Sequence, residues 1–360
     1  MTALFLKDDI RELVPTTRYQ GSKRRILPWI YENTKHLKFH TVLDGFGGTG
    51  SVSYLFKLMG KQVTFNDLLQ TNYETGVAII ENDTIRLEEE DINFIISKNG
   101  FKYPCFIQKT FKDIYFLDSE NKWLDMVVFN IEQLSEKYRG DLLSKKKALA
   151  YNALFQACLC KRPFNLFHRK NLYLRTARVK RSFGNKKSWN AKFGKLFIKF
   201  CNEITNKIFS NNERNKSMCK DVMDIENTCF DLVYFDPPYR RPDEKLPRDY
   251  YYLYHFFEGL LDYDNWWRKI NWNTKNRSLI KKKTKWEDNS LEENFDFLFN
   301  RFKKSIIVVS YGDPGYPSIR TIGNLLRKYK SNVHLIKTPY NYKLNHKNGN
   351  GLYEVLIIGK

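Results

Sequence analysis

Apolar residues follow two patterns along the chain: short unbroken runs, and longer stretches with the spacing of a helix. Near the N-terminus, the runs "HTVLD" and "KQVTFND" enclose the glycine-rich "GFGGTG" and the helix-like "SVSYLFKLMG". Short buried runs are typical of strands, and a glycine such as Gly60 commonly ends a helix. The pattern therefore predicts a strand, a glycine turn, a helix and a second strand, within an α/β segment over residues 18–80.

A second α/β segment is predicted for residues 216–360. Its runs "FDLVYF", "KSIIVVS", "NVHLIKTPYNYK" and "GLYEVLIIGK" have the length and the β-branched and aromatic composition of strands. The last two flank the polar, glycine-containing "LNHKNGN", a pattern that predicts a hairpin closing the sheet.

The residues between these segments have a different character. Helical spacing dominates "WLDMVVFNIEQLSEKYRGDLLSKKKALAYNALFQACL", residues 123–159. We therefore expect residues 1–84 and 216–360 to form the two parts of one α/β domain. Residues 85–215 are expected to form a mostly helical insert in that domain.

Composition points to a charged partner. The chain has 360 residues, of which 42% are hydrophobic and 16% aromatic, so it can build a large core and is not a disordered chain. Its formal net charge is +21. An excess of this size favours a polyanion such as nucleic acid as the partner, against the alternative of a protein that is merely rich in lysine.

Cysteine usage and the absence of targeting signals suggest the compartment. None of the six cysteines forms a C-x-x-C pair, which argues against a zinc site and against a disulfide framework, and favours reduced thiols. The start "MTALFLKDDIREL" lacks the apolar core of a signal peptide, and no run approaches the roughly 18 apolar residues of a membrane span. We expect a cytoplasmic protein.

Positive charge is concentrated in residues 161–195. This run contains twelve Lys or Arg, six interleaved aromatic residues and no Asp or Glu. A solvated basic face is the alternative to a nucleic-acid surface, but such faces usually mix both signs of charge, as the rest of this chain does. The absence of acids therefore favours contact with phosphates.

Two features near the first α/β segment are typical of a nucleotide-like ligand. Glycines between a strand and a helix allow close approach of the backbone, although "GFGGTG" has neither dinucleotide nor P-loop spacing and could be a plain tight turn. Asp67, at the end of "VTFND", could accept hydrogen bonds from ribose hydroxyls or cap a helix. Asp221 could meet an adenine amino group or cap a turn.

The stretch "DLVYFDPPYRRP", residues 231–242, ends a strand abruptly, because proline lacks an N–H and fixes φ. It presents the Asp236 carboxylate, the Pro237 carbonyl and the Tyr239 ring at the carboxyl end of a strand, where open α/β sheets bind ligands. An exocyclic amine on an aromatic base is a poor nucleophile, and two acceptors on its protons would localise its lone pair. Tyr239 could stack on the base and hold it out of a duplex. A surface turn that happens to read D-P-P-Y is the alternative.

Together these motifs resemble the Dam-type adenine-specific DNA methyltransferases, which transfer a methyl group from S-adenosylmethionine (SAM) to the 6-amino group of adenine. "DPPY" at 236–239 resembles the catalytic motif of that family. "DGFGGTGS" at 44–51 resembles its SAM motif, with Gly45 in place of the usual proline, and "RYQGSKRRIL" from Arg18 resembles its N-terminal motif. The order of these motifs is similar to that of the alpha group, in which an insert before the catalytic motif reads the DNA target.

The resemblance implies a Rossmann-like SAM-dependent methyltransferase fold with a closing β-hairpin and an inserted, mostly helical target-recognition domain. It implies catalysis by Asp236, Pro237 and Tyr239, with no metal. The implied cofactor-binding residues are Tyr19, Lys23, Asp44, Phe46, Gly48, Gly50, Asp67, Asp221 and Asp236. The DNA-binding candidates in the basic run are Arg162, Asn165, Arg169, Lys170, Asn171 and Arg175. The expected partners are double-stranded DNA and a cognate restriction endonuclease, and a monomer is favoured.

Three other functions use some of the same features. An RNA adenine methyltransferase could use the same acceptors, and a cytosine 4-amino methyltransferase could do so too, although its motif more often begins with Ser. A catalytically silent DNA-binding protein would keep the basic run without needing an intact D-P-P-Y. The long segment "RDYYYLYHFFEGLLDYDNWW" after the catalytic motif could close over a flipped base or touch DNA.

Overall fold

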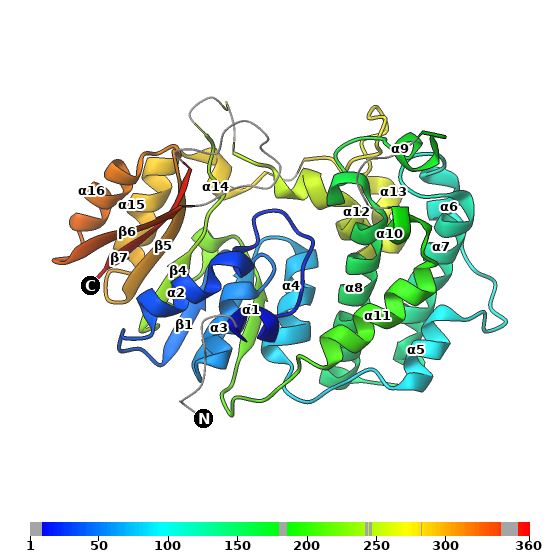
Figure 1. Ribbon diagram of the computed structural model, residues 1–360, viewed down its shortest axis with the longest axis horizontal. Helices are drawn as coiled ribbons and strands as arrows, with labels where there is room; N and C mark the ends of the chain where they lie inside the picture. Colours follow the sequence, from blue (N-terminus) through cyan, green and yellow to red (C-terminus); the bar gives the residue numbers. More distant parts are fainter. Residues whose placement is uncertain (1–8, 180–185, 242–243, 245–246, 282, 340–351) are drawn as a thin grey trace.

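The computed structural model describes residues 9–179, 186–241, 244, 247–281, 283–339 and 352–360. Within these residues, a seven-stranded sheet in the order β3-β2-β1-β4-β5-β7-β6 forms the centre of one half of the molecule (Figure 1). Neighbours from β3 to β5 are parallel, and β7 is antiparallel to both β5 and β6. The strands are β1 (Thr41–Asp44), β2 (Gln62–Asp67), β3 (Lys216–Cys219), β4 (Leu232–Phe235), β5 (Ile306–Asp313), β6 (Val333–Pro339) and β7 (Tyr353–Gly359).

The sheet confirms the strands predicted from the apolar runs. β1 and β2 come from the first α/β segment, and β4 to β7 correspond to the four runs of the second. The edge strand β3 has no such run and was not among the predicted strands. The predicted hairpin is confirmed in its pairing, because Val333 of β6 lies opposite Gly359 of β7 and Pro339 lies opposite Tyr353. The connecting "LNHKNGN" lies outside the described residues.

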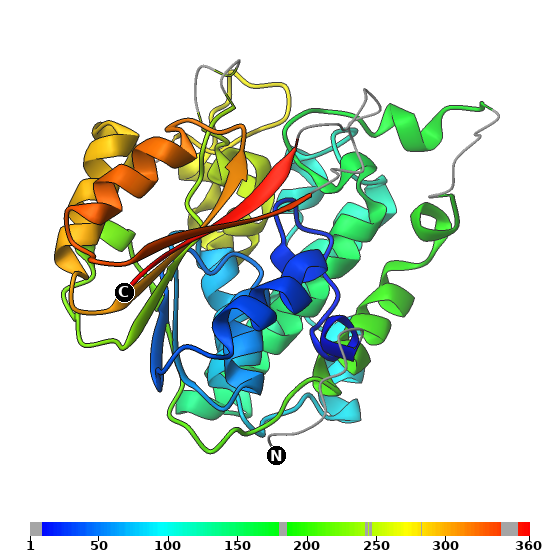
Figure 2. The same cartoon turned by 60° about the vertical axis from the view of Figure 1, so that its left-hand side comes forward.

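Helices cover both faces of the sheet, as the continuous apolar runs of its central strands require. Leu43 and Val233 point towards α15 and α16, whereas Val42 and Tyr234 point towards α2 and α3. Figure 2 shows the orange helices and the blue helices on opposite sides of the strands. One layer contains α1 (Asp9–Leu13), η1 (Lys23–Ile26), α2 (Leu27–Thr34), α3 (Ser51–Leu58), α4 (Gln70–Gly76) and η2 (Val77–Glu81), and the other contains η5 (Val222–Asp224), α14 (Lys285–Asp288), α15 (Leu291–Arg301) and α16 (Ile319–Arg327).

The other half of the molecule is helical and lies beyond α4 (Figure 1). The predicted helical stretch 123–159 is confirmed as α7 and α8. The division of the chain at residues 85 and 215 into a catalytic domain and a target-recognition domain stays a prediction. This half contains α5 (Glu89–Ile96), α6 (Phe106–Thr110), α7 (Asp118–Glu132), η3 (Gln133–Glu136), α8 (Gly140–Lys161), η4 (Pro163–Asn165), α9 (Tyr173–Thr176), α10 (Lys186–Asn190), α11 (Phe193–Thr205), α12 (Tyr250–Leu261), η6 (Tyr263–Asn265) and α13 (Trp266–Lys269).

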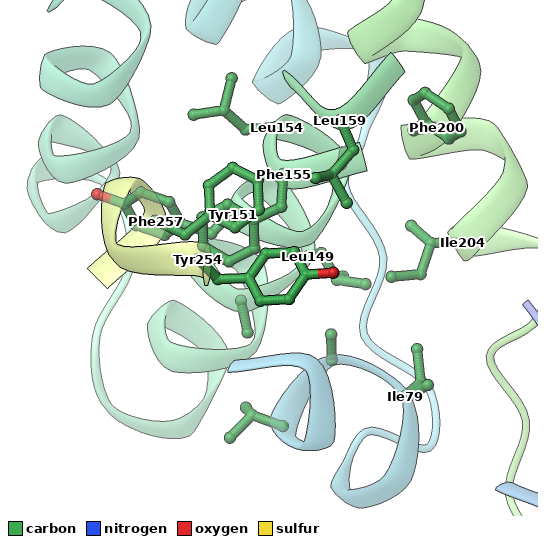
Figure 3. Packing of buried hydrophobic residues seen from close by; sticks show 14 of the residues in the cluster. Ile79, Leu149, Tyr151, Leu154, Phe155, Leu159, Phe200, Ile204, Tyr254 and Phe257 are labelled. Carbon is green, nitrogen blue, oxygen red and sulfur yellow. The ribbon is translucent and has the colours of Figure 1, made fainter. Parts of the chain in front are cut away.

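One apolar cluster joins the two halves (Figure 3). Phe155 of α8 stacks on Phe257 of α12 with ring centroids 4.6 Å apart. Tyr254, on the same helix, lies beside them, and Ile79 of η2 extends the cluster towards the sheet. Helix α12 follows the D-P-P-Y segment in the sequence, so this packing fixes the chain that leaves that segment against the helical half.

The described residues contain no helix long and apolar enough to cross a membrane. All six cysteines belong to the described residues, and each is a free thiol.

Candidate active site

A pocket of about 530 Å³ opens at the carboxyl ends of β1 and β4. Its walls come from the segment before η1, the glycine turn after β1 and the D-P-P-Y residues after β4. The strand order reverses between β1 and β4, and open α/β sheets bind ligands at such a switch point. The volume is typical of a site for a cofactor-sized molecule.

The glycine turn, residues 45–50, is built for close packing. A Cβ atom at Gly47 would lie 2.1 Å from the Phe65 ring, so this position excludes any side chain. Gly50 has a φ of 69°, in the left-handed region that glycine adopts without strain, and it begins α3. A Cβ atom at Gly45 would lie 2.9 Å from the Phe235 ring, so a larger residue here would require that ring to shift.

Asp44 and Asp67 lie beside this turn with different surroundings. Asp44 is buried; its Oδ2 accepts a 2.6 Å hydrogen bond from Ser53, and its Oδ1 has no hydrogen-bond partner among the described residues. Burial raises the pKa of Asp44 to about 7, although the Ser53 hydroxyl opposes the rise. Asp67 instead accepts hydrogen bonds from the backbone N–H groups of Gly48 (2.8 Å) and Leu69 (2.9 Å), and so braces the turn.

Asp236 belongs to a buried cluster of three charges. The Lys23 ammonium lies 2.8 Å from a carboxylate oxygen of Asp236 and 2.9 Å from one of Glu354. Glu354 belongs to β7 and also accepts a 3.0 Å hydrogen bond from Ser310 of β5. The cluster therefore ties the N-terminal segment, the D-P-P-Y segment and the closing hairpin together beside the pocket.

The charges of this cluster set its protonation. Burial would lower the pKa of Lys23, but the Asp236 and Glu354 carboxylates raise that pKa well above its ordinary value. Burial raises the pKa of Asp236 to about 6; the Lys23 ammonium opposes this rise and Glu354 adds to it. Two carboxylates share one ammonium, so Asp236 and Glu354 compete for the same positive charge.

Tyr239 is held by the end of β5. Its ring packs against Tyr311 with centroids 4.6 Å apart. A Cβ atom at Gly312 would lie 2.0 Å from the Tyr239 hydroxyl oxygen, so the absence of a side chain at Gly312 makes room for Tyr239. Because Pro237 and Pro238 stiffen the backbone before it, the ring has a defined position beside Asp236.

Tyr19 lies at the opposite wall of the pocket in an aromatic stack. Its ring stacks on Tyr254 at 4.0 Å and on Tyr250 at 5.7 Å. The Tyr254 hydroxyl accepts a 2.8 Å hydrogen bond from the backbone N–H of Gln20. Helix α12 therefore holds the N-terminal segment against the pocket.

The remaining wall contains Phe46, Trp286 and Asp221. Phe46 packs edge-on against the buried Trp286 ring at 5.1 Å, and the Trp286 indole N–H has no hydrogen-bond partner among the described residues. Both carboxylate oxygens of Asp221 accept backbone hydrogen bonds, from Met223 at 3.1 Å and from Lys285 at 2.9 Å. The turn-cap alternative for Asp221 is thus confirmed.

Comparison with known proteins identifies the family. The family model of the D12 class N6 adenine-specific DNA methyltransferases matches residues 19–265. The chain belongs to this family. Its reaction is the methylation of adenine in DNA. A known relative, the type II methyltransferase M2.HphI of Haemophilus parahaemolyticus, is 28% identical over 343 residues, which cover 92% of this chain and 94% of the relative.

Most of the residues predicted for the site of this D12 methyltransferase lie around one pocket. Gly50 does not line it, and acts on the turn through its backbone conformation. Their individual roles in catalysis and cofactor binding stay predictions. The predicted residues that line the pocket are Tyr19, Lys23, Asp44, Phe46, Gly48, Asp67, Asp221, Asp236, Pro237 and Tyr239.

Three residues of the site were missed from the sequence. Glu354 is the one acid in the apolar run "LYEVLIIG", and a lone acid in a buried strand is a signal for a paired or functional charge. Gly312 is the next-to-last residue of β5, close to the edge of the sheet where ligands bind. Trp286 gave no signal, since it lies in a lysine-rich stretch far from the motifs.

The predicted DNA contacts of the methyltransferase need correction. Arg162 is fully buried, and its guanidinium donates two hydrogen bonds, of 3.0 and 2.8 Å, to the Leu166 carbonyl. Asn171 is also fully buried. Arg175 makes a two-pronged ion pair with Glu120, with both distances 2.8 Å. Arg162 and Asn171 are buried and Arg175 is already paired with Glu120, so we do not retain these three residues as DNA contacts.

Arg169 and Lys170 are exposed and Asn165 is partly exposed, as a DNA contact requires. Phe164, immediately before Asn165, is 56% exposed, which is unusual for a large apolar side chain. The buried Arg162 holds the loop that presents these residues.

The fit of Tyr239 against Gly312 gives a test. In Gly312→Ala, the new methyl group displaces the Tyr239 ring, so we expect kcat to fall roughly 5- to 150-fold, which corresponds to the roughly 1–3 kcal/mol that stacking contributes per base. Cofactor affinity, measured by calorimetry, should change little. Gly194→Ala is the matched control, because a Cβ atom there meets nothing within 4 Å. Wild-type kcat in Gly312→Ala would contradict the role given to Tyr239.

Proposed function

We propose that this adenine methyltransferase uses SAM as its methyl donor and duplex DNA as its substrate, and that the switch-point pocket is the catalytic site. The observation that carries the proposal is the placement of Asp236 and Asp44 at the ends of adjacent strands, around one pocket. When bound, SAM supplies a methyl group activated by its sulfonium.

The pocket offers complementary groups for SAM. The unpartnered Oδ1 of Asp44 is a buried acceptor, which suits the amino group of the methionine part. Asp67 has lone pairs left for ribose hydroxyls, and Phe46 and Trp286 provide apolar surface for an adenine ring. Tyr19 and the backbone of Gly48 complete the set, and Asp221 supports it from its position as a turn cap.

The target amine is held by acceptors of the D-P-P-Y segment. The Asp236 carboxylate accepts one amine proton and the Pro237 carbonyl accepts the other, which localises the nitrogen lone pair. Tyr239 stacks on the extruded base. Fixing the amine in line with the methyl donor converts a bimolecular step into an effectively unimolecular one, with effective molarities of up to roughly 10⁵–10⁸ M.

Lys23 acts mainly on Asp236 in this proposal. Its ammonium contacts the Asp236 carboxylate directly, so it keeps the acid ionised and fixes its orientation. Glu354 contacts the same ammonium and raises the pKa of Asp236, so it opposes the effect of Lys23. Lys23 is therefore a positioning residue for the catalytic acid as well as a wall of the cofactor site.

DNA contact is proposed for the exposed part of the basic run. Arg169 and Lys170 are the candidates for phosphates, and Asn165 for a base edge. The relative M2.HphI is described as a type II methyltransferase. We propose by analogy that this chain also acts in a restriction–modification system. Its cognate endonuclease would cleave DNA that lacks the methyl group.

The product decides between this function and its rivals. Purified protein with SAM and duplex DNA should yield 6-methyladenine, measured by mass spectrometry of the digested DNA. Asp236→Ala should abolish transfer and retain SAM binding in calorimetry. Formation of 4-methylcytosine alone, or activity on RNA alone, would falsify the assignment.

The pH dependence of transfer should respond in opposite directions to two substitutions. Because the pKa of Asp236 is about 6, kcat should fall as the pH drops below about 6 and reach a plateau above it. Lys23→Gln removes the positive charge that lowers this pKa, so the acid limb should move to higher pH. Glu354→Gln removes a charge that raises it, so the limb should move to lower pH.

The control for this pair is Glu136→Gln, at an exposed acid in η3. Its pH profile should match that of the wild type. Shifts of the acid limb in the same direction for Lys23→Gln and Glu354→Gln would show that Asp236 is not the titrating group.

Asp44→Asn should separate stability from cofactor binding. The folded-state pKa of about 7 lies above the ordinary value of 3.8, so Asp44 makes the wild type lose stability as the pH rises between these values. The variant should lose less thermal stability between about pH 4 and pH 7. Its SAM affinity should fall at least about tenfold, since hydrogen bonds to charged groups contribute about 1.5–3 kcal/mol. Unchanged SAM affinity in calorimetry would remove Asp44 from the cofactor site.

A further inference from the structure

A second acid-free basic stretch follows α12. Residues 265–286 contain eight Lys or Arg and four Trp, and no Asp or Glu. The match to the D12 family ends at residue 265, so all of this stretch after its first residue lies beyond the match. Neither the catalytic motif nor the cofactor pocket accounts for most of these residues.

The structure folds part of this stretch into a closed loop, residues 270–280, which we call the Trp272 loop. Ile270 pairs with Leu279 in an antiparallel bridge. The backbone N–H of Asn271 donates to the Ser278 carbonyl at 2.8 Å, and that of Ile280 donates to the Lys269 carbonyl at 2.7 Å. In Figure 1 this yellow segment projects beyond α13, at the end of the molecule where α9 lies.

The Trp272 loop exposes aromatic and cationic groups together. Trp272 is 49% exposed, and the Arg277 guanidinium lies 5.3 Å from the centre of its ring. Lys275 is exposed between them. Within the described part of the chain, no acidic side chain forms an ion pair with Lys275 or Arg277, whereas Lys269 pairs with Asp262.

A buried network fixes this loop to the loop before α9. Asn276 is buried; its carbonyl accepts a 2.6 Å hydrogen bond from the Tyr115 hydroxyl, and its side-chain amide donates a 3.1 Å hydrogen bond to the Phe167 carbonyl. His255 lies 2.9 Å from the same hydroxyl, and burial lowers the pKa of His255 to about 3, which keeps its ring neutral.

Phe167 belongs to the loop that exposes Phe164, Arg169 and Lys170. Arg162 closes the base of that loop through the Leu166 carbonyl. Two loops with exposed cations and an exposed aromatic ring thus share one rigid, buried foundation.

We propose that the Trp272 loop is a second DNA-contacting surface, which acts beside the loop of residues 163–170. Lys275 and Arg277 neutralise backbone phosphates of the duplex, and Trp272 packs against the sugar–phosphate backbone. Duplex DNA is the occupant because unpaired cations, an exposed ring and the neighbouring basic loop complement a polyanion. The inference rests on the proposed function, in which duplex DNA is the substrate.

The test measures binding of a duplex of random sequence across a salt series, by fluorescence anisotropy. In Lys275→Ala/Arg277→Ala, we expect weaker binding and a decrease of about 2 in the slope of log K against log salt, because each phosphate contact contributes about 0.9. Trp272→Ala should weaken binding with little change of slope. Lys275→Arg/Arg277→Lys should restore the wild-type slope, which separates loss of charge from loss of folding.

Lys98→Ala/Lys102→Ala is the matched control, because both lysines are exposed on the loop between α5 and α6 in the same helical half. It should keep the wild-type slope. A wild-type slope in Lys275→Ala/Arg277→Ala would overturn the inference and leave the proposed function intact. If the wild type itself binds RNA and not duplex DNA, the proposed substrate fails and the inference fails with it.

Discussion

The shared ammonium of Lys23 is the interaction on which the site depends. It joins an acid from the catalytic motif to an acid from the closing strand, and Lys23 itself comes from the segment before the first strand. Removing one partner of a buried ion pair typically costs about 3–5 kcal/mol, because the remaining charge loses its compensation. A substitution of a charged residue in one of these three segments therefore affects the other two.

Helix α12 extends this dependence from the pocket to the exposed basic loops. Towards the pocket, Tyr254 stacks on Tyr19, and the Glu258 carboxylate accepts a 2.8 Å hydrogen bond from the backbone N–H of Thr71 at the start of α4. Towards the basic loops, the Tyr252 hydroxyl donates a 2.7 Å hydrogen bond to the His168 carbonyl. The aromatic helix after D-P-P-Y therefore connects the pocket with the loop before α9 through polar contacts on both of its sides.

The sequence contained enough to predict the sheet and the pocket, because short apolar runs, glycines and prolines act through local backbone geometry. Asp67 and Asp236 were found because each follows or ends an apolar strand, and parallel strands end at the same edge. Asp44 was found because the glycine motif that it begins resembles that of the family. Glu354 was missed because its partner is distant in the sequence. The basic run was predicted to contact DNA from its composition. Composition does not reveal that the Arg162 side chain is buried and binds the Leu166 carbonyl. Packing in three dimensions decides such cases.

The order of the strands has a consequence for synthesis of the chain. β1 pairs with β2 on one side and with β4 on the other, and β4 begins at Leu232. During translation, the backbone groups along one edge of β1 have no strand to pair with until the helices between β2 and β3 have left the ribosome. An unpaired apolar edge is a site for aggregation. Helices α7 and α8 consist largely of local contacts that form quickly, so the helical half can be compact before the sheet is completed.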